Sequence, residues 1–356
     1  MKKIVIVGIQ GVPAKYGGFE SLVENLIGDN CPRDVHYTIF CSSKDYVERL
    51  AEYKGATLKY IPLHANGVQS IPYDMVGLMR SICGYDAVVV LGVSGCLFLP
   101  IFRLLCRKKL IVNIDGLEHR RAKWGKVARW VLRTSEAMAV RLADVVIADN
   151  KGIQDYVWET YRRKAELIAY GGDHVWRDVP MEKQLEVLSR YGVKDNDYAI
   201  TVCRIEPENN SRMILEAFAR SGKNLVFIGN WERSEYGRTL KAEFGNRENI
   251  HCVDAVYDLD TLYALRSRCC CYIHGHSAGG TNPSLVEAMF FGRPILAFDV
   301  VYNRETTNNE AYYFSDKEKL MELLSLPDFK SGEPLREYAR QHYTWKHIAE
   351  QYEHLY

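Results

Sequence analysis

The sequence has 356 residues, 47% of them hydrophobic and 26% charged, which is long enough for two domains of an ordinary globular protein. Its formal net charge of +1 argues against a nucleic-acid-binding protein that depends on overall charge. No apolar run approaches the roughly 18 residues that a membrane-spanning helix needs. The ten cysteines form no C-x-x-C pair, and their mostly apolar surroundings favour reduced thiols in the cytoplasm.

The first 26 residues combine a strand with a glycine-rich loop. The apolar run Lys3–Val7 is typical of a buried β-strand, and no cleavage-site pattern of a secretory signal follows it. In the next segment, GIQGVPAKYGGFE, Gly17 and Gly18 directly precede a helical pattern over Phe19–Leu26. These glycines either let a phosphate or sugar approach the backbone or simply form a loop. Because the segment is not G-x-G-x-x-G, a dinucleotide-dependent dehydrogenase is not favoured.

Strand-like apolar runs alternate with helical stretches along the rest of the chain. Further strands are expected in the first half at Tyr37–Cys41, Leu58–Pro62, Ala87–Gly92, Lys109–Asn113 and Val145–Asp149. After Gly171 the expected strands are Tyr198–Cys203, Leu225–Gly229, Ile250–Val253 and Cys270–His274, with helices at Arg212–Ala219, from Ser234 and at Asp260–Arg268. This pattern predicts an α/β protein of two Rossmann-like domains, residues 1–170 and 171–335. The last stretch, Leu335–Tyr356, is typical of a single amphipathic helix.

The stretch from Tyr272 to Asp299 is expected to form a strand, a glycine-rich loop, a short helix and a second strand, and its loop and helix form the main candidate ligand site. Asn282 is a favourable N-cap, Pro283 suits the first helical position, and Gly292 followed by a proline ends the helix. The free N–H groups at the helix start, after Gly275, Gly279 and Gly280, suit an anionic group such as a phosphate. Ser284 and Glu287 share one helix face, where Glu287 would accept hydrogen bonds from sugar hydroxyls. The alternative is a buried connection between two strands with a solvated Glu287.

A cation is expected at the same edge of the second sheet. Arg204 directly follows the strand Tyr198–Cys203, and open α/β sheets bind ligands at the carboxyl ends of their strands. A guanidinium there would bind a diphosphate through paired hydrogen bonds, although an arginine after a strand is also a common surface residue. In the loop before the helix, His274 and His276 would either contact a sugar or satisfy backbone groups.

The segment NIDGLEHRRAKW, after the strand Lys109–Asn113, holds the candidate catalytic carboxylates of the first domain. Asp115 and Glu118 are best placed to orient or deprotonate an acceptor hydroxyl, and His119 is a third candidate. Alternatively, Asp115 caps a turn and Glu118 is solvated. No spacing rule selects between these roles.

Two D-x-D pairs match the spacing that metal-dependent sugar transferases use, namely Asp195 with Asp197 and Asp258 with Asp260. The first pair lies in a polar turn, and Asp258 is a natural N-cap for a helix that begins near Thr261. A structural role therefore explains both pairs better. Since an arginine and a helix start would neutralise a leaving diphosphate, we expect no metal and no other cofactor.

The run HRRAKWGKVARWVLR, residues 119–133, carries six Lys or Arg residues with interleaved tryptophans. Basic residues and tryptophans on a helix fit contact with an anionic membrane surface, which would suit a lipid-pyrophosphate acceptor. The alternative is an ordinary surface helix whose apolar side covers the first sheet. The sequence thus predicts a cytoplasmic protein with a peripheral contact to the inner face of the plasma membrane, and no nucleic-acid partner.

Together these motifs resemble the GT-B nucleotide-sugar glycosyltransferases of the retaining family 4 type. The combination of GIQGVPAKYGGFE, NIDGLEHRRAKW, RIEPENN and GHSAGGTNPSLVEAM is similar to a bacterial rhamnosyltransferase-like group that builds capsule, O-antigen and other surface polysaccharides. The resemblance covers essentially the whole chain. It implies two Rossmann-like domains that face each other across a cleft, with a final helix, residues 336–356, that crosses back to the first domain.

The resemblance also implies individual roles. Arg204 and the N–H groups from Thr281 to Ser284 would hold the donor diphosphate, and Glu287 would hold the ribose. The full set of donor-binding candidates is Gly17, Gly18, Arg204, Asn209, Gly279, Gly280, Thr281, Asn282, Ser284 and Glu287. Asn209 stands where the wider family often has a lysine, and Gly279 stands where the first of two paired glutamates is usual. The second departure suits an altered sugar such as a 6-deoxyhexose.

The expected function is transfer of a sugar from a nucleoside diphosphate to a lipid-linked saccharide, with Asp115, Glu118 and Arg204 as the catalytic candidates. The favoured donor is a deoxythymidine diphosphate-linked rhamnose, and retention of configuration is implied only by the resemblance. Alternatives are a hexosyltransferase that uses a UDP- or GDP-sugar, a sugar-nucleotide epimerase, and a non-catalytic nucleotide-sugar-binding scaffold. The basic run counts against an epimerase, which needs no acceptor.

Overall fold

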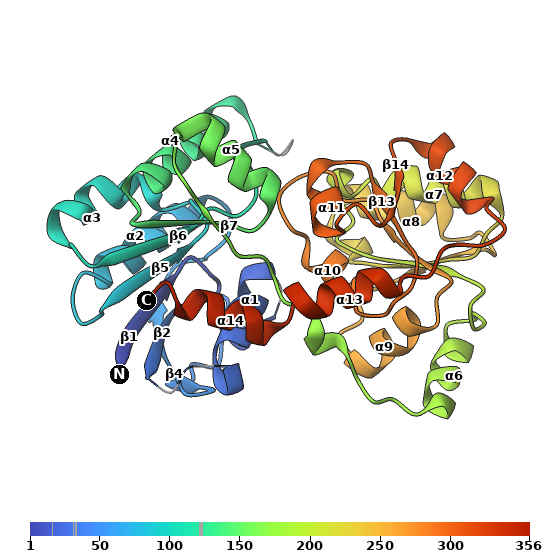
Figure 1. The fold of residues 1–356 in the computed structure, drawn as a ribbon, viewed down its shortest axis with the longest axis horizontal. Helices are drawn as coiled ribbons and strands as arrows, with labels where there is room; N and C mark the ends of the chain where they lie inside the picture. Colours follow the sequence, from blue (N-terminus) through green and yellow to red (C-terminus); the bar gives the residue numbers. More distant parts are fainter. Residues whose placement is uncertain (16, 31, 33, 121–123) are drawn as a thin grey trace. The chain divides into compact units, whose positions relative to one another are not determined.

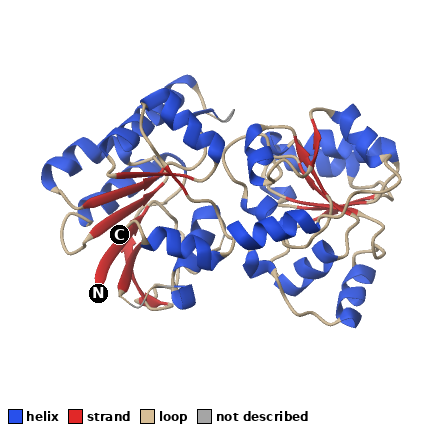
Figure 2. Ribbon diagram, viewed as in Figure 1, coloured by secondary structure: helices blue, strands red, loops and turns tan. Residues whose placement is uncertain are grey.

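The computed structural model describes residues 1–356 except 16, 31, 33 and 121–123, and the chain forms two compact units (Figure 1). The first unit contains residues 1–171 and 345–356, and the second contains residues 172–344. In each unit helices cover both faces of a central sheet (Figure 2). This arrangement confirms the predicted α/β class.

The first unit is built on an eight-stranded sheet with the order β3-β4-β2-β1-β5-β6-β7-β8. Neighbouring strands are parallel except for β3 and β4. The strands are β1 (Lys2–Val7), β2 (Val35–Ser42), β3 (Glu52–Tyr53), β4 (Ala56–Ile61), β5 (Ala87–Leu91), β6 (Lys109–Asn113), β7 (Val145–Ala148) and β8 (Glu166–Leu167). The central strand β1 is apolar and buried on both faces, as a covered parallel sheet requires. It ends at Gly8, where φ is +103° and a Cβ would lie 2.1 Å from the carbonyl oxygen of Leu91.

The α-helices formed by the described residues of this unit are α1 (Gly18–Leu26), α2 (Ser70–Arg80), α3 (Leu99–Leu105), α4 (Lys126–Leu142), α5 (Lys151–Tyr161) and α14 (Trp345–Glu353). The last of them, α14, completes the hydrophobic core of the first unit. Trp345, Ile348 and Tyr352 are buried among side chains of β1, β2 and β5. The side chain of Asn113, at the end of β6, donates a hydrogen bond of 3.0 Å to the Tyr352 hydroxyl. Residues from the two ends of the sequence therefore share one core.

The second unit has a six-stranded, wholly parallel sheet with the order β11-β10-β9-β12-β13-β14. Its strands are β9 (Ala199–Val202), β10 (Leu225–Ile228), β11 (Ile250–Val253), β12 (Cys271–His274), β13 (Ile295–Phe298) and β14 (Tyr312–Phe314). Its α-helices are α6 (Met181–Arg190), α7 (Ser211–Ser221), α8 (Glu235–Phe244), α9 (Leu259–Ser267), α10 (Pro283–Met289), α11 (Val301–Thr306), α12 (Lys317–Leu324) and α13 (Glu333–His342). From β9 the chain builds outward through β10 and β11, and from β12 it builds in the opposite direction. The point between β9 and β12 is therefore a topological switch point.

The expectation of one helix over Leu335–Tyr356 was wrong. Two helices, α13 and α14, are separated at Tyr343 and Thr344, and the second unit extends to Thr344 rather than to residue 335. Tyr343 is buried in the second unit, where its hydroxyl donates to the carbonyl of Thr306 at 3.1 Å. Trp345 is buried in the first unit, where a Cβ on Gly171 would lie 2.5 Å from its ring. Because these two anchors belong to different cores, the helix breaks between them.

Candidate functional site

The candidate donor residues of the second unit gather at the carboxyl edge of its sheet, beside the switch point between β9 and β12. Arg204 follows β9, and the loop 275–282 follows β12 and leads into α10. Since β9 and β12 are hydrogen-bonded neighbours, the two loops leave the sheet next to each other. Open α/β sheets bind ligands at this kind of position.

Hydrogen bonds hold these two loops together. The side chain of Asn210 donates to the carbonyl of Gly275 at 2.8 Å, and the backbone N–H of Ser277 donates to the carbonyl of Glu208 at 2.9 Å. A Cβ at Gly275 would lie only 2.2 Å from the carbonyl oxygen of Asn209, so glycine is required for this approach. The contacts fix Arg204 and α10 within one rigid part of the unit.

Asn209 links the two loops through its side chain. Its side chain is almost fully buried, its Nδ2 donates to the carbonyl of Arg204 at 2.7 Å, and its Oδ1 accepts from Nδ1 of His276 at 2.7 Å. Both ends of the carboxamide are thus engaged within the protein. Any contact of Asn209 with a donor would therefore come in addition to this structural role.

Arg204 remains accessible at the strand end. Its side chain is 38% exposed, and its Nη1 lies 3.8 Å from Oε1 of Glu206, which is too long for a strong hydrogen bond. A guanidinium with this weak internal pairing retains donors for an oxyanion.

The start of α10 has the predicted cap. The Oδ1 of Asn282 accepts from the backbone N–H of Ser284 at 3.0 Å and from the Ser284 hydroxyl at 2.8 Å. These two side chains therefore satisfy each other. Just before the cap, Gly279 adopts a φ of +94°, which favours glycine, and Gly280 and Thr281 are buried.

Glu287, the expected ribose ligand, has two partners that the sequence did not indicate. Its Oε2 lies 2.7 Å from Nη2 of Arg266, and its Oε1 lies 3.5 Å from Nε2 of His174. The Arg266 side chain is only 4% exposed, whereas that of Glu287 is 19% exposed. Glu287 therefore neutralises a buried guanidinium of α9, and any contact that it makes with a ligand would come in addition to this role.

The two histidines before α10 lie in different environments. His276 is held by Asn209, as described above. His274 is buried at the end of β12, and its Nε2 has no hydrogen-bonding partner within the described part of the chain. Burial, assisted by the nearby His276, lowers the pKa of His274 well below its ordinary value. Its imidazole is consequently neutral at physiological pH.

At the carboxyl edge of the first sheet, Gly17 makes room for a buried carboxylate. It adopts a φ of +126°, and a Cβ there would lie 2.0 Å from Oε2 of Glu20. Glu20 accepts a hydrogen bond of 2.9 Å from the backbone N–H of Gln10, while Gly18 is the first residue of α1. Burial raises the pKa of Glu20, and the charge of Asp115 adds to this effect, whereas the bond from Gln10 opposes it. The packing of Glu20 therefore requires a glycine at position 17, whether or not Gly17 also contacts a ligand.

The candidate acceptor residues follow β6. Asp115 adopts a φ of +60°, and its backbone N–H donates to the side chain of Asn113 at 3.0 Å. Glu118 accepts a hydrogen bond of 2.9 Å from the indole N–H of Trp124. The structure places these carboxylates in the first unit and Arg204 in the second.

His119 is oriented by a carboxylate that sequence reasoning missed. Its Nδ1 lies 3.0 Å from Oε2 of Glu136, a buried residue of α4, and the hydroxyls of Tyr156 and Tyr161 each donate to the other oxygen at 2.8 Å. Burial alone would raise the pKa of Glu136, but these three hydrogen bonds outweigh it and lower the pKa below its ordinary value.

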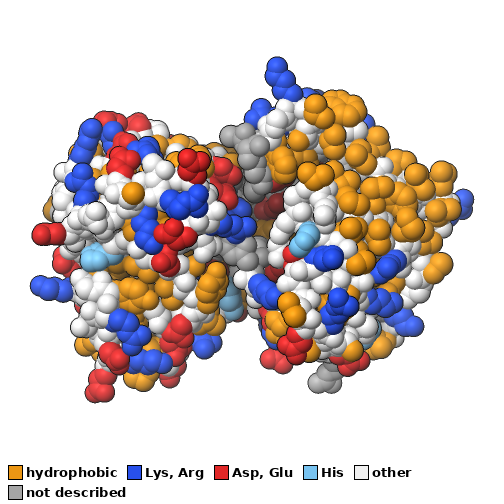
Figure 3. All heavy atoms as spheres, turned by 180° about the vertical axis from the view of Figure 1, so that it is seen from behind, with side chains coloured by type: hydrophobic (Ala, Val, Ile, Leu, Met, Phe, Trp, Pro, Cys, Tyr) orange, Lys and Arg blue, Asp and Glu red, His pale blue; other side chains and the backbone are white. Residues whose placement is uncertain are grey.

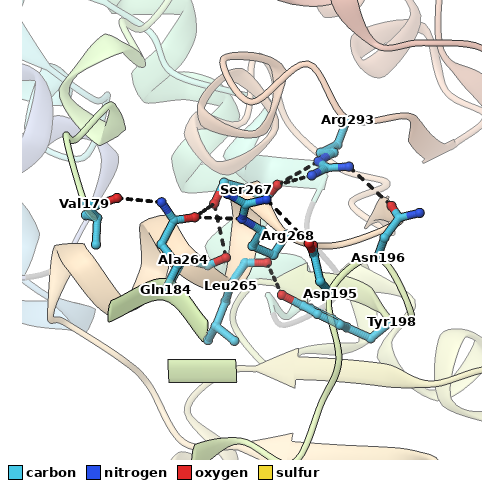
Figure 4. Close-up of polar contacts among 10 residues, drawn as sticks. All are labelled: Val179, Gln184, Asp195, Asn196, Tyr198, Ala264, Leu265, Ser267, Arg268 and Arg293. Atoms are coloured by element: carbon cyan, nitrogen blue, oxygen red, sulfur yellow. Dashed lines mark hydrogen bonds and ion pairs between the residues drawn. The ribbon is translucent and has the colours of Figure 1, made fainter. Parts of the chain in front are cut away.

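Both D-x-D pairs serve the fold. Figure 4 shows the carboxyl end of α9, where Arg268 contacts Asp195 at 3.5 Å and Gln184 at 2.8 Å. Asp258 caps α9 by accepting from the N–H of Thr261 at 2.9 Å, and Asp260 pairs with Lys183 at 2.7 Å. Among the described residues, no group of three or more His, Cys, Asp or Glu side chains is arranged to hold a metal ion.

Two further predictions concern the state of the cysteines and the presence of membrane-spanning helices. The described cysteines are all free thiols, and Cys31 lies outside the described residues. No helix in the described ranges has the length and apolar character needed to cross a bilayer. Of the basic run 119–133, Arg121, Ala122 and Lys123 also lie outside the described residues, and helix α4 begins only at Lys126.

A parallel six-stranded sheet, a second Rossmann-like sheet and a final helix that belongs to the first unit define the GT-B fold. Residues 189–342 match the family model described as "Glycosyl transferases group 1". Residues 1–173 match the model described as "Domain of unknown function (DUF1972)". This second model covers nearly all of the first unit, and its description assigns no function to that unit.

Solved structures with the same fold cover this chain almost completely. A sucrose-phosphate synthase from Thermosynechococcus elongatus has 18% identity and a TM-score of 0.83, covering 100% of this chain and 98% of its own. HepE from Anabaena, in complex with UDP, has 14% identity and a TM-score of 0.75, covering 99% of both chains. A glycosyltransferase from Rickettsia africae has 12% identity and a TM-score of 0.74, covering 99% of this chain and 97% of its own. At these identities the likeness establishes the fold. No curated protein matches the sequence significantly.

Proposed function

We propose that this protein transfers a sugar from a nucleoside diphosphate to a saccharide acceptor, with the donor bound at the β9–β12 switch point of the second unit. The observation that carries this proposal is the match of residues 189–342 to the group 1 glycosyl transferases, because it spans Arg204, the loop 275–282 and Glu287. The complex of HepE with UDP supports a nucleotide ligand for this fold.

The chemistry follows from the residues at this edge. As the bond from the anomeric carbon to the diphosphate breaks, negative charge develops on the departing phosphate. Arg204 would neutralise this charge together with the backbone N–H groups of Thr281 and Asn282, because Pro283 has no N–H and that of Ser284 donates to Asn282. We propose that this neutralisation needs no metal ion. Among the described residues, Nε of Arg266 and Nε2 of His274 are buried without a hydrogen-bonding partner. Because buried polar atoms are normally hydrogen-bonded, these two nitrogens also favour a polar ligand at this edge of the sheet.

The donor sugar is proposed to be a 6-deoxyhexose, with deoxythymidine diphosphate-linked rhamnose favoured, and the acceptor a lipid-linked saccharide of a surface polysaccharide. Gly279 supports this choice, since its φ of +94° disfavours the glutamate that would meet additional sugar hydroxyls. On the acceptor side, Asp115 and Glu118 would orient the attacking hydroxyl. Retention of configuration is part of the same proposal.

A donor-binding screen tests the proposal. The purified protein would be unfolded thermally with thymidine, uridine and guanosine diphosphates and their sugars, alongside Arg204→Gln. A ligand that binds only the folded state adds about 2.7 kcal/mol of stability at a hundredfold excess over its Kd. Arg220→Gln is the matched control, because Arg220 is an exposed arginine of the same unit near the end of α7.

We expect a thymidine diphosphate sugar to raise the unfolding temperature of the wild type and of Arg220→Gln, but not that of Arg204→Gln. If none of the nucleotides changes the unfolding temperature, the donor site is assigned incorrectly. Donor binding with interconversion of the sugar nucleotide in the absence of acceptor would identify an epimerase instead. Binding without transfer to any saccharide would identify a scaffold.

A further inference from the structure

A cavity of about 520 Å³ lies at the amino edge of the second sheet, the edge opposite to the candidate donor site. It is lined by the residues that directly precede four strands, namely Tyr198 before β9, Asn224 before β10, Cys270 before β12 and Pro294 before β13. Because the proposed sugar transfer takes place at the carboxyl edge, any chemistry in this cavity is separate from donor binding.

The charges around this cavity are mixed. On the second unit, which lies on the left in Figure 3, basic and acidic side chains are interspersed. The charged residues that line the cavity are Lys223, Arg293, Asp197 and Asp328. Of these, Arg293 is occupied within the protein, since its Nε donates to the carbonyl of Ser267 at 2.8 Å (Figure 4). A cavity of mixed charge does not select an ion of one sign, and it admits a small neutral molecule.

Two adjacent cysteines distinguish this cavity. Cys270 is partly exposed, whereas Cys271 is the first residue of β12 and is buried, and both line the cavity. Their sulfur atoms lie only 3.9 Å apart. Consecutive side chains within a strand point to opposite faces, but Cys270 lies in the bend before the strand, which allows this approach. Cys269 does not join the pair, because its buried thiol donates to the carbonyl of Arg266 at 3.1 Å.

The contact between the two sulfurs makes their acidities unequal. It lowers the pKa of the Cys270 thiol, an effect that burial opposes and the charge of Lys223 supports. The same contact, together with burial, raises the pKa of Cys271 well above its ordinary value. By comparison, burial raises the pKa of Cys203 and Cys252. Cys270 is therefore the member of the pair that ionises, and the thiolate is the form of cysteine that peroxides oxidise.

We propose that Cys270 and Cys271 form a redox site that hydrogen peroxide converts into a disulfide. The Cys270 thiolate attacks one peroxide oxygen, the O–O bond breaks, and hydroxide leaves, so that Cys270 becomes a sulfenic acid. The sulfur of Cys271 then attacks the sulfenic sulfur. An S–S bond forms, and the sulfenic oxygen leaves as water with the proton of Cys271. The hydroxide takes up the proton that Cys270 had lost, so the two thiols give two electrons to the peroxide, which becomes two molecules of water.

This disulfide should be easy to reduce again. The Cα atoms of adjacent residues are about 3.8 Å apart, closer than the roughly 4.4 Å or more of ordinary disulfides. Closing the bond therefore strains the start of β12, where the backbone N–H of Cys270 donates to the carbonyl of Tyr198 at 2.8 Å and Cys271 pairs with Ala199 of β9. Strained disulfides are the labile ones. The inference goes beyond the proposed function, because this thiol chemistry requires neither donor nor acceptor.

Peroxide treatment of the purified full chain tests the redox site. After exposure to hydrogen peroxide, the remaining thiols would be alkylated, and fragmentation mass spectrometry of the peptides would identify the state of each cysteine. Cys270→Ala removes the proposed thiolate, and Cys271→Ala removes its partner. The matched control is Cys269→Ala, which removes a neighbouring thiol that is bonded to Arg266 instead. Cys83, which is exposed in the first unit, serves as the internal reference thiol.

In the wild type and in Cys269→Ala, peroxide should link Cys270 to Cys271 before it oxidises Cys83, and dithiothreitol should restore both thiols. In Cys271→Ala, the sulfenic acid of Cys270 should persist, and dimedone should trap it. In Cys270→Ala, Cys271 should stay reduced. Lys223→Gln keeps both thiols, and it should slow the oxidation about twofold, as expected for the loss of one exposed charge.

Three results would overturn the proposal. The first is oxidation of Cys83 while Cys270 stays reduced. The second is a disulfide that joins Cys270 to a cysteine other than Cys271, in the same chain or in another. The third is equal trapping of sulfenic acid by dimedone in the wild type and in Cys271→Ala. Unaltered circular dichroism shows that the variants are folded, and Lys223→Gln, which leaves the core intact, tests the thiolate even if Cys271→Ala does not fold.

Discussion

The guanidinium of Arg266 lies 2.7 Å from the carboxylate of Glu287, and the arginine side chain is only 4% exposed. Replacing Glu287 with alanine would leave a buried cation without its partner, which typically costs about 3–5 kcal/mol. We therefore expect Glu287→Ala to destabilise the second unit severely, whether or not Glu287 binds a ligand. Denaturant unfolding of the variant measures this cost.

The variant Glu287→Gln distinguishes the structural role of Glu287, its ion pair with Arg266, from a role in ligand binding. It preserves the shape and one acceptor for Arg266, so its loss of stability should be clearly smaller than that of Glu287→Ala. If Glu287 holds ribose hydroxyls, Glu287→Gln should remain folded yet bind the donor less tightly in a titration. Equal unfolding free energies for the two variants would contradict the importance of the ion pair.

Glu136 should stabilise the first unit in a pH-dependent manner. Its three hydrogen bonds lower its pKa below the ordinary value of 4.5, so its contribution is present above pH 4.5 and disappears as the pH falls through the lower value of the folded state. Glu136→Gln should therefore lose about 1–3 kcal/mol of unfolding free energy at neutral pH and progressively less in acid. Urea unfolding of the wild type and of Glu136→Gln, from neutral pH into acid, measures this pH-dependent difference. Tyr161→Phe, which removes a single donor, should show a smaller loss.

Gly17→Ala should be more damaging than its backbone angle alone implies. An alanine at a positive φ typically costs about 1–2 kcal/mol. At Gly17 the added Cβ would also displace the carboxylate of Glu20 and its hydrogen bond with Gln10. Gly84→Ala is the matched control, because Gly84 has a φ of +90° and nothing within 4 Å of a Cβ. Comparable unfolding free energies for the two variants would show that Glu20 does not require this glycine.

Asp74 should make the first unit less stable as the pH rises. This residue of α2 is buried, and burial raises its pKa from 3.8 to about 8 despite a hydrogen bond from the N–H of Gly95. Between these values the folded state holds a proton that the unfolded state has lost, so the unfolding free energy falls by up to about 1.4 kcal/mol per pH unit. Asp74→Asn removes this dependence and should gain on the wild type as the pH increases.

Urea midpoints of the wild type and Asp74→Asn at several pH values give the test, with Asp155→Asn, which changes an exposed carboxylate, as the control. A constant difference between wild type and Asp74→Asn across the range would mean that Asp74 is ionised in the folded protein.

The sequence predicted the strands that lie inside the two sheets. Valine and isoleucine runs identify β1, β5 and β6, because a strand buried on both faces must be continuously apolar. It did not predict β8, whose two residues are exposed, or β3, which has only two residues. Such short edge strands carry no periodic pattern, and tertiary pairing alone forms them.

The candidate site was predictable only where local chemistry determines it. The cap at Asn282 follows from a short motif, and its hydrogen bond confirms it. The partners of Glu287 are different, since Arg266 lies in another helix and His174 lies before the first strand of the second unit. An arginine in a helical pattern is normally exposed, so only the packed structure shows that this one is buried.

Helix α14 has a consequence for the order in which the protein is made. The strands of the first unit are synthesised first, yet Trp345, Ile348 and Tyr352 fill its core only after the entire second unit has been translated. During synthesis, part of the apolar surface of the first unit therefore stays exposed until α14 has been translated. The second unit, which is continuous in sequence, has no such delay. Ribosome-bound chains of this protein should consequently depend on chaperones for the half that emerges first.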